Sequence, residues 1–261
     1  MSLFERYLTL WVLVCIAGTL LIAAVAWGAG REVAKNPPPE EPPSQAPGKP
    51  TAGNPALEGA RLVFRSRYLL SVVAIVGLYE IVSTVMDFQF TATVVHYLEG
   101  DAIGQQFATV YTITNVVALL VQLLFTSLVM TRFGVGVALL VLPIAALGGS
   151  GAFMAMPILF FGSALNTADN AFSYSINQSA KEALYVPTTR DEKYKAKAFI
   201  DMFVQRFAKA IAVGVSLGIT TVFADFSSVR WLSIFTTAIT VLWILAARYA
   251  GRHFREMTEG K

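Results

Sequence analysis

The chain has 261 residues, of which 55% are hydrophobic and only 14% are charged, and its mean hydropathy is +0.59. Soluble domains carry roughly 25% charged residues, so this composition excludes an ordinary soluble domain and predicts an integral membrane protein. The formal charge of +3 is small and we expect no nucleic-acid partner, while the single cysteine, Cys15, excludes an internal disulfide.

Apolar runs long enough to cross a bilayer recur along the sequence. A hydrocarbon core about 30 Å thick needs ~20 residues of helix, and this length test predicts an all-α protein with about seven membrane spans. Three glycines and a serine at 148–151 predict a tight turn between the fourth and fifth spans. In chain order, the expected spans are 7–28, 68–86 with a polar continuation to 98, 105–130, 134–147, 152–171, 198–222 and 229–247.

The sequence divides into three parts. Residues 1–30 hold a single span, residues 31–66 a basic cytoplasmic linker, and residues 67–261 a block of six spans with a cytoplasmic C-terminal tail. Eight of the eleven prolines lie in 36–55, a composition that favours an extended spacer; a docking segment for a proline-binding module is the less common use. Residues 57–67 predict a short amphipathic helix at the membrane interface.

Lysine and arginine gather in alternate loops, as they do on the cytoplasmic side of membrane proteins. The other loops carry Glu99 and Asp101, no charge, or only Asp225. We therefore predict an amino terminus outside and a carboxyl terminus in the cytoplasm. The basic segments carry Arg31, Lys35, Lys49, Arg61, Arg65 and Arg67; then Arg132; then Lys193, Lys195 and Lys197; and finally Arg248, Arg252, Arg255 and Lys261.

One span, a cytoplasmic linker and a six-span block follow one another in an informative order. Transporters built from two six-helix halves join the halves by a cytoplasmic loop and bind their substrate at the membrane midplane between them. This chain has the order that remains when such a transporter lacks its first five helices, so the first span would be helix six. A cleaved signal peptide, with Ala24-Val25-Ala26 before the cut, is the alternative interpretation of that span.

The fifth span becomes strongly polar toward its end. Spacings of three and four residues place Asn166, Asn170, Ser173 and Asn177 on one helical stripe, which predicts the wall of an aqueous cavity. A helix that leaves the membrane near Asp169 and continues as a solvated extension would have the same pattern. Both interpretations stay open.

Five ionisable residues lie at or inside predicted spans: Lys181, Glu182, Asp201, Arg206 and Lys209. Charges there cost several kcal/mol unless they face water or a partner, so they indicate a substrate path. The run of Lys193, Lys195 and Lys197 is explained either by topology or by substrate contacts.

Two acidic residues of the second span are seven positions apart. Glu80 and Asp87 therefore lie on one helical face, about two turns apart. We expect either of them to bind a coupling proton or to offset Arg206 or Lys209 inside the bundle, because an isolated charge there is costly.

The same region resembles a known family. The nucleotide transporters of the ATP:ADP antiporter type, which have the major facilitator fold, carry a similar ordered series of motifs, and the resemblance covers about the last 195 residues, corresponding to helices seven to twelve. Arg132-Phe133-Gly134-Val135-Gly136 is similar to the family's turn before helix nine. The series in this chain is Tyr174-Ser175, Lys181-Glu182, Tyr185-Val186-Pro187, Lys193/Lys195/Lys197, Ile200-Asp201 and Arg206/Lys209.

The resemblance implies half of a carrier, in the inner (plasma) membrane of a bacterium, that moves a nucleotide or another anionic solute by alternating access. A partner half is then expected: a second chain, a copy of this one, or an upstream reading frame. The implied substrate-binding residues are Asn166, Asn170, Tyr174, Asn177, Lys181, Arg206 and Lys209, and the implied charge-balancing or coupling residues are Glu80, Asp87, Glu182 and Asp201.

The chain also departs from the family's pattern. Ser173 stands where family members carry a lysine, Gln178-Ser179 where they carry Asp-Pro, and Asp87 is followed by Gln89 and Phe90 instead of an aromatic residue and a cation. Two lysines that attract phosphate are therefore missing, which keeps two alternatives open: a degenerate, non-transporting membrane module, and a major facilitator carrier of another organic anion.

No enzyme signature competes with a transport function. The sequence has no phosphate-cradling glycine loop, no metal-ligand spacing of cysteine or histidine, and only two histidines. We therefore expect no enzymatic activity, cofactor or metal, and any nucleotide would be cargo.

Overall fold

The computed structural model describes residues 55–189, 192–222 and 226–259, together with a few single residues before Pro55. The expected first span, 7–28, and the proline-rich linker lie outside these ranges, so both stay predictions. The chain divides into two units, Met1–Ala52 and Gly53–Lys261, and the helices α2 to α11 belong to the second.

Two helices separated by a single residue begin the described part. α2 covers Pro55–Arg65, and proline suits a helix start because the N–H that it lacks would have no helical partner there. α3 covers Arg67–Tyr97. The hydroxyl of Ser66 caps α3 by accepting a hydrogen bond from the Leu69 backbone N–H at 3.3 Å. The structure thus has a helix where one was expected over 57–67, and α3 contains the second predicted span together with its polar continuation.

The third predicted span lies in one long helical run with a π-helical segment inside it. α4 covers Asp101–Leu120, the π-helix η1 covers Val121–Thr126, and α5 covers Ser127–Arg132. The backbone then turns at Gly134, whose φ of +79° lies in the left-handed region that glycine adopts without strain.

α6 covers Gly134–Ala155 without a break, so the turn predicted at 148–151 is wrong. One face of this stretch packs against the following helix through Gly149, while Gly148 and Gly151 face open space. A Cβ on Gly149 would lie 2.5 Å from Leu165 Cδ1, so this glycine allows α6 and the following helix to approach closely. The chain turns at Pro157 instead, where the preceding residue is extended (φ −141°, ψ 93°), as residues before proline favour.

The polar half of the fifth span continues as helix well beyond its predicted end. α7 covers Leu159–Phe172, the π-helix η2 covers Ser173–Asn177, and α8 covers Gln178–Ala183. The turn after α8 is tied to the start of α3, because the Tyr68 hydroxyl donates a hydrogen bond to the Leu184 carbonyl at 2.6 Å.

The basic segment, predicted to be a loop, is helical where the structure describes it. The π-helix η3 covers Glu192–Ala196, α9 covers Lys197–Phe199, the π-helix η4 covers Ile200–Val204 and α10 covers Gln205–Val222. Lys193, Lys195 and Lys197 therefore belong to helical turns and not to a loop. α2 packs against this start: a Cβ on Gly59 would lie 2.5 Å from the Lys195 carbonyl oxygen.

The last span extends into the segment expected to be a tail. The 3-10 helix η5 covers Phe226–Arg230, and α11 continues over Trp231–Glu259. Arg248, Arg252 and Arg255 consequently lie on a helix.

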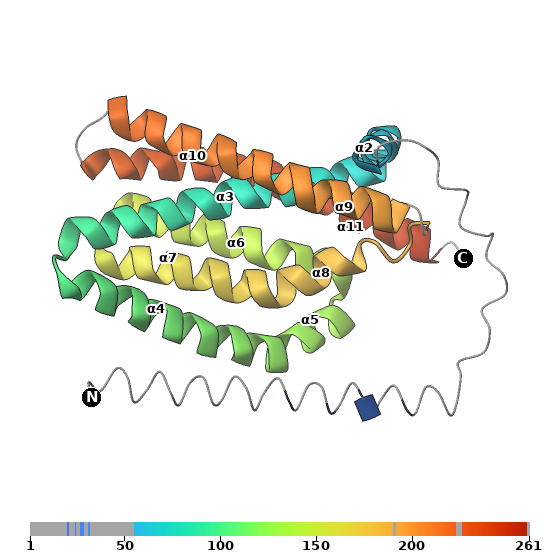
Figure 1. Ribbon diagram of the computed structural model, residues 1–261, viewed down its shortest axis with the longest axis horizontal. Helices are drawn as coiled ribbons and strands as arrows, with labels where there is room; N and C mark the ends of the chain where they lie inside the picture. The colour runs from blue at the N-terminus through green and yellow to red at the C-terminus, as the bar shows by residue number, and fades with distance from the viewer. Residues whose placement is uncertain are drawn as a thin grey trace. The chain divides into compact units, whose positions relative to one another are not determined.

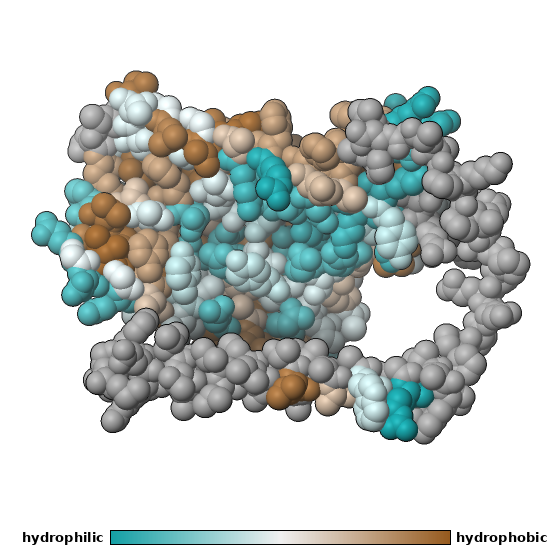
Figure 2. All heavy atoms as spheres, in the orientation of Figure 1, coloured by the Kyte–Doolittle hydropathy of each residue, from teal (hydrophilic) through white to brown (hydrophobic). Residues whose placement is uncertain are grey.

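The helices pack in two layers (Figure 1). α4, α7, α3 and α10 lie side by side in one layer, in that order, while α6 and α11 pack against each other and against α7 and α3. The core between the layers includes the fully buried side chains of Trp243, Phe153 and Leu139. Figure 2 shows a band of hydrophilic residues across one face, in the region between α10 and α4.

Five helical segments of the described part are long and apolar enough to cross a membrane: Arg67–Tyr97, Asp101–Arg132, Gly134–Ala155, Glu192–Val222 and Ser228–Thr258. The run from α7 to α8 is long enough but is not among the apolar ones, because polar residues fill its second half. The protein is an all-α membrane protein, as the composition predicted.

Candidate functional site

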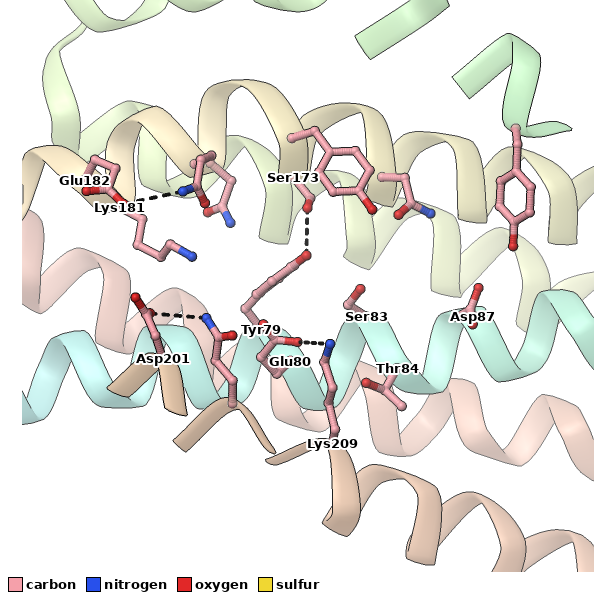
Figure 3. Close-up of a pocket in the computed structure, with 16 residues that line it drawn as sticks. Tyr79, Glu80, Ser83, Thr84, Asp87, Ser173, Lys181, Glu182, Asp201 and Lys209 are labelled. Carbon is pink, nitrogen blue, oxygen red and sulfur yellow. Dashed lines mark hydrogen bonds and ion pairs between the residues drawn. The ribbon is translucent and has the colours of Figure 1, made fainter. Parts of the chain in front are cut away.

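A cavity of about 890 Å³ opens within the hydrophilic face, between the α7–α8 run and α10 (Figures 2 and 3). Its walls come from α3, α7, η2, α8, η4 and α10, with Tyr111 contributed by α4. The residues implied by the family resemblance gather here, with two exceptions. Those that line the cavity are Glu80, Asp87, Asn170, Tyr174, Asn177, Lys181, Glu182, Asp201 and Lys209.

Asn166 is the first exception, because it lies behind the cavity wall. Its side chain is buried at 1% exposure, and its amide nitrogen donates a hydrogen bond to Asp87 Oδ1 at 3.1 Å. It therefore orients a carboxylate that lines the cavity, and its own contact with a solute stays a prediction.

Arg206 is the second exception and does not line the cavity, so its role in substrate binding stays a prediction. Asp201, Gln205 and Lys209 follow one another at spacings of four residues and share the stripe of the η4–α10 helix that faces the cavity. Arg206 comes one position after Gln205, which rotates it about 100° around a helix of 3.6 residues per turn, and its side chain is exposed.

The cavity contains an ion pair between two helices far apart in sequence. Lys209 Nζ lies 3.4 Å from Glu80 Oε2, and Figure 3 shows the pair bridging α10 and α3. The Glu80 side chain is only 10% exposed, whereas that of Lys209 is 58% exposed. One of the pairings expected from the sequence is therefore present, with the carboxylate as its buried member.

A second ion pair lies at the end of the cavity next to α9. Lys197 Nζ contacts both Glu182 carboxylate oxygens, at 2.6 and 2.7 Å, and lies 5.7 Å from the ring centroid of Tyr185. Burial raises the pKa of the Tyr185 hydroxyl, and the nearby carboxylates of Asp201 and Glu182 raise it further, so this phenol stays protonated. This pair connects α8 to α9.

Lys181 and Asp201 form no ion pair with any described residue. Both side chains point into the cavity, from α8 and η4 respectively (Figure 3). Asp201 accepts only a long hydrogen bond, 3.4 Å, from Gln205 Nε2. Of the two lysines that line the cavity, Lys209 is paired with Glu80, and Lys181 has no carboxylate partner among the described residues.

Several cavity residues were not expected as site residues from the sequence. Two of them, Tyr79 and Ser83 of α3, make hydrogen bonds to the α7–η2 helix: the hydroxyls of Tyr79 and Ser173 lie 2.7 Å apart, and Ser83 donates to Asp169 Oδ2 at 2.6 Å. Asp169 itself is 3% exposed. Spacings of four from Tyr79 through Ser83 to Asp87 would have found this polar stripe of α3. The unexpected lining residues are Tyr79, Ser83, Thr84, Tyr111, Gln178 and Gln205, whereas Ser173 was expected from the polar stripe of the fifth span.

Two of the wall segments are π-helices. η2 supplies Ser173, Tyr174 and Asn177, and η4 supplies Asp201. A π-helical turn widens the helix and changes the direction of the side chains that follow, and such turns are frequent at functional sites. No group of three histidine, cysteine or acidic residues in the described part is arranged to hold a metal ion.

The sequence matches the family described as TLC ATP/ADP transporter over residues 2–160 and 146–254. This match confirms the resemblance and extends it toward the amino end, beyond the region that carries the motifs. No solved structure matches the chain.

Curated relatives with sequence similarity come from Chlamydia. ADP,ATP carrier protein 1 of Chlamydia muridarum (strain MoPn / Nigg) is 23% identical over 267 residues, which cover 92% of this chain and 50% of that relative. ADP,ATP carrier protein 1 of Chlamydia pneumoniae is 22% identical over 272 residues, which cover 95% of this chain and 53% of that relative.

ADP,ATP carrier protein 2 of Chlamydia trachomatis serovar D (strain ATCC VR-885 / DSM 19411 / UW-3/Cx) is 24% identical over 221 residues, covering 76% of this chain and 41% of that relative. The chain thus spans about half the length of the curated relatives that it matches. The family and these relatives are transporters and not enzymes. Since the family match extends over most of the sequence, this chain belongs to the TLC ATP/ADP transporter family.

Proposed function

We propose that the chain forms one half of a carrier that moves an anionic, nucleotide-like solute across the membrane by alternating access. The observation that carries this proposal is the polar cavity inside an apolar helix bundle, with Lys209 exposed on its wall and Lys181 forming no ion pair among the described residues. Ammonium groups in such a place are costly unless water and an anion reach them. Membership of a transporter family supports the same function.

The size and lining of the cavity suit a nucleotide. Ligand pockets for molecules of this size occupy roughly 300–1,000 Å³, and this cavity has about 890 Å³. We assign the phosphates to Lys181 and Lys209, while Tyr111 and Tyr174, which are 43% and 66% exposed, offer aromatic faces for the base.

The Glu80–Lys209 pair suggests how the empty site avoids an uncompensated charge. Without cargo, Glu80 neutralises Lys209; a phosphate that enters would compete for the same ammonium. Because the pair joins α10 to α3, exchanging one anion for another would loosen the contact between these helices. This is the step that we propose for the change between the two access states.

The charge of this wall indicates what the facing wall has to supply. Four carboxylate residues and two lysines line the cavity, and one of the lysines is already paired. An anionic cargo therefore needs further cations from the other side. A second copy of this chain would repeat the same excess of carboxylates, so we propose a different, cation-richer partner half, either as a second chain or as part of a longer protein.

The location follows from the same proposal. We place the protein in the inner membrane of a bacterium, with the amino terminus outside and the carboxyl terminus in the cytoplasm, because the basic segments alternate with neutral or acidic ones. In this orientation Lys181 and the η3–α9 segment lie at the cytoplasmic end of the bundle.

Exchange assays in liposomes test the proposal. The purified chain alone is expected to give no exchange of ATP for ADP, and the complete transporter with its partner half is expected to give exchange that unlabelled ATP and ADP inhibit. Robust exchange by the monomeric chain would contradict the half-carrier. Inhibition by unrelated organic anions but not by nucleotides would assign the cavity to another anion.

One observation favours a second candidate, a non-transporting membrane module. Ser173 and Gln178 line the cavity at positions where the family resemblance implies charged residues, and carboxylates outnumber ammonium groups. If every candidate partner half forms a stable complex with the chain and no anion is exchanged, this second function replaces the first.

A further inference from the structure

A groove separate from the cavity lies between the start of α6 and the end of α11. It has a volume of about 420 Å³ and takes its lining only from these two helices, neither of which lines the first cavity. Figure 1 shows both helix ends at the same end of the bundle. The groove therefore faces away from the proposed transport path.

Three arginines stand along one edge of this groove. Arg248, Arg252 and Arg255 follow at spacings of four and three, which places their guanidinium groups on one face of α11. None of them forms an ion pair with a carboxylate in the part of the chain that the structure describes. The nearby Glu256 is instead paired with His253, with Nδ1 and Oε2 3.5 Å apart.

The rest of the groove is apolar. Val137 and Leu140 of α6 and Leu245 of α11 line it, and Leu245 lies one turn before the first arginine. The helix backbones touch at its base, because a Cβ on Gly251 would lie 2.9 Å from the Gly136 Cα. The groove thus combines an apolar trough with a cluster of cations at the end of a membrane-spanning helix.

We propose that this groove binds an anionic phospholipid, with the phosphate at the three arginines and one acyl chain along the apolar trough. A guanidinium group pairs with phosphate oxygens through two parallel N–H donors, and basic pockets between membrane helices on the cytoplasmic side are suited to anionic headgroups. A soluble anion would use the arginines alone and leave the apolar trough in water. Because the arginines and the apolar part of the groove form one continuous surface, a lipid fits this site better than a free phosphate does.

Native mass spectrometry of the purified chain in detergent tests this site. The probes are phosphatidylglycerol, phosphatidylcholine with the same acyl chains, and glycerol 3-phosphate as the free headgroup. We expect phosphatidylglycerol to bind at least about tenfold more tightly than phosphatidylcholine, since each cation near an anionic lipid contributes about fivefold. R248Q/R252Q/R255Q should abolish this preference.

The matched control is R61Q/R132Q/R230Q, which neutralises the same number of exposed arginines outside the groove and should keep the preference. Val137→Trp places a large side chain in the apolar part of the groove from an exposed position. It should weaken the binding of phosphatidylglycerol severalfold without removing a charge, so it also tests the site if the triple arginine variant does not fold.

Three results would overturn the proposal. Equal loss in both triple variants would show a general charge effect. Equal, arginine-dependent affinity for glycerol 3-phosphate and phosphatidylglycerol would show a site for free phosphate. Absence of any preference between the two lipids would show no headgroup site. None of these outcomes depends on whether the chain transports nucleotides.

Discussion

Removing the two members of the Glu80–Lys209 pair one at a time should have unequal effects on stability. At 3.4 Å and an effective dielectric constant of about 20, the attraction between two unit charges is about 5 kcal/mol. Because the Lys209 side chain is 58% exposed, water screens most of this attraction, and the net contribution of the pair to the free energy of unfolding falls to about 1 kcal/mol.

The asymmetry comes from burial. Lys209→Gln leaves the Glu80 carboxylate, which is 10% exposed, without its cation, and an unpaired buried charge costs about 2 kcal/mol or more. Glu80→Gln leaves an ammonium that water already reaches, so it should cost less than about 1 kcal/mol. The double variant should be more stable than the sum of the two single changes predicts.

The assay is unfolding in mixed micelles by sodium dodecyl sulfate, followed by tryptophan fluorescence, to which the buried Trp243 contributes. The matched control is Lys197→Gln, which breaks the pair with Glu182; both of its members are at least a third exposed, so the loss should stay below about 1 kcal/mol. If Glu80→Gln destabilises the protein as much as Lys209→Gln does, the assignment of Glu80 as the buried, dependent member is wrong.

Three further predictions concern the cavity, the packing and the topology. In the complete transporter, Lys181→Gln should weaken nucleotide binding by at least about tenfold, since a hydrogen bond to a charged group contributes about 1.5–3 kcal/mol. Lys193 is exposed and outside the cavity, so Lys193→Gln should leave binding unchanged; equal effects would remove Lys181 from the site. Gly149→Ala should destabilise the fold by about 1–3 kcal/mol because the added Cβ meets Leu165. The added Cβ of Gly148→Ala meets open space, so this control should be neutral or stabilising by up to about 1 kcal/mol. The reverse order of stability in thermal unfolding would contradict the close α6–α7 contact. The orientation can be tested in a cysteine-free background with a membrane-impermeant maleimide added to intact cells. The reagent should label Glu99→Cys and leave Lys193→Cys unlabelled until the membrane is opened. The opposite labelling pattern would invert the proposed orientation.

The sequence by itself determined where most helices lie and which residues are polar within them. Length and apolarity decide whether a segment can cross a bilayer, so the helical segments Arg67–Tyr97, Glu192–Val222 and Ser228–Thr258 contain the spans predicted at 68–86, 198–222 and 229–247. Periodicity placed Glu80 and Asp87 on one face, and both line the cavity. The turn predicted at 148–151 was wrong because glycine permits a turn but does not require one, and α6 continues to Ala155 with Gly149 in close contact with Leu165 of α7.

Only the tertiary structure decided which polar residues share a cavity. The rotation of α10 about its axis turns Lys209 inward and Arg206 outward, and the π-helical turns before it shift that rotation in a way that spacing does not show. The depth of the α3–α7 contact buries Asn166 behind Asp87. The groove with three arginines exists because the backbones of α6 and α11 touch at two glycines 115 positions apart, and contacts between residues so distant in sequence follow from packing and not from local pattern.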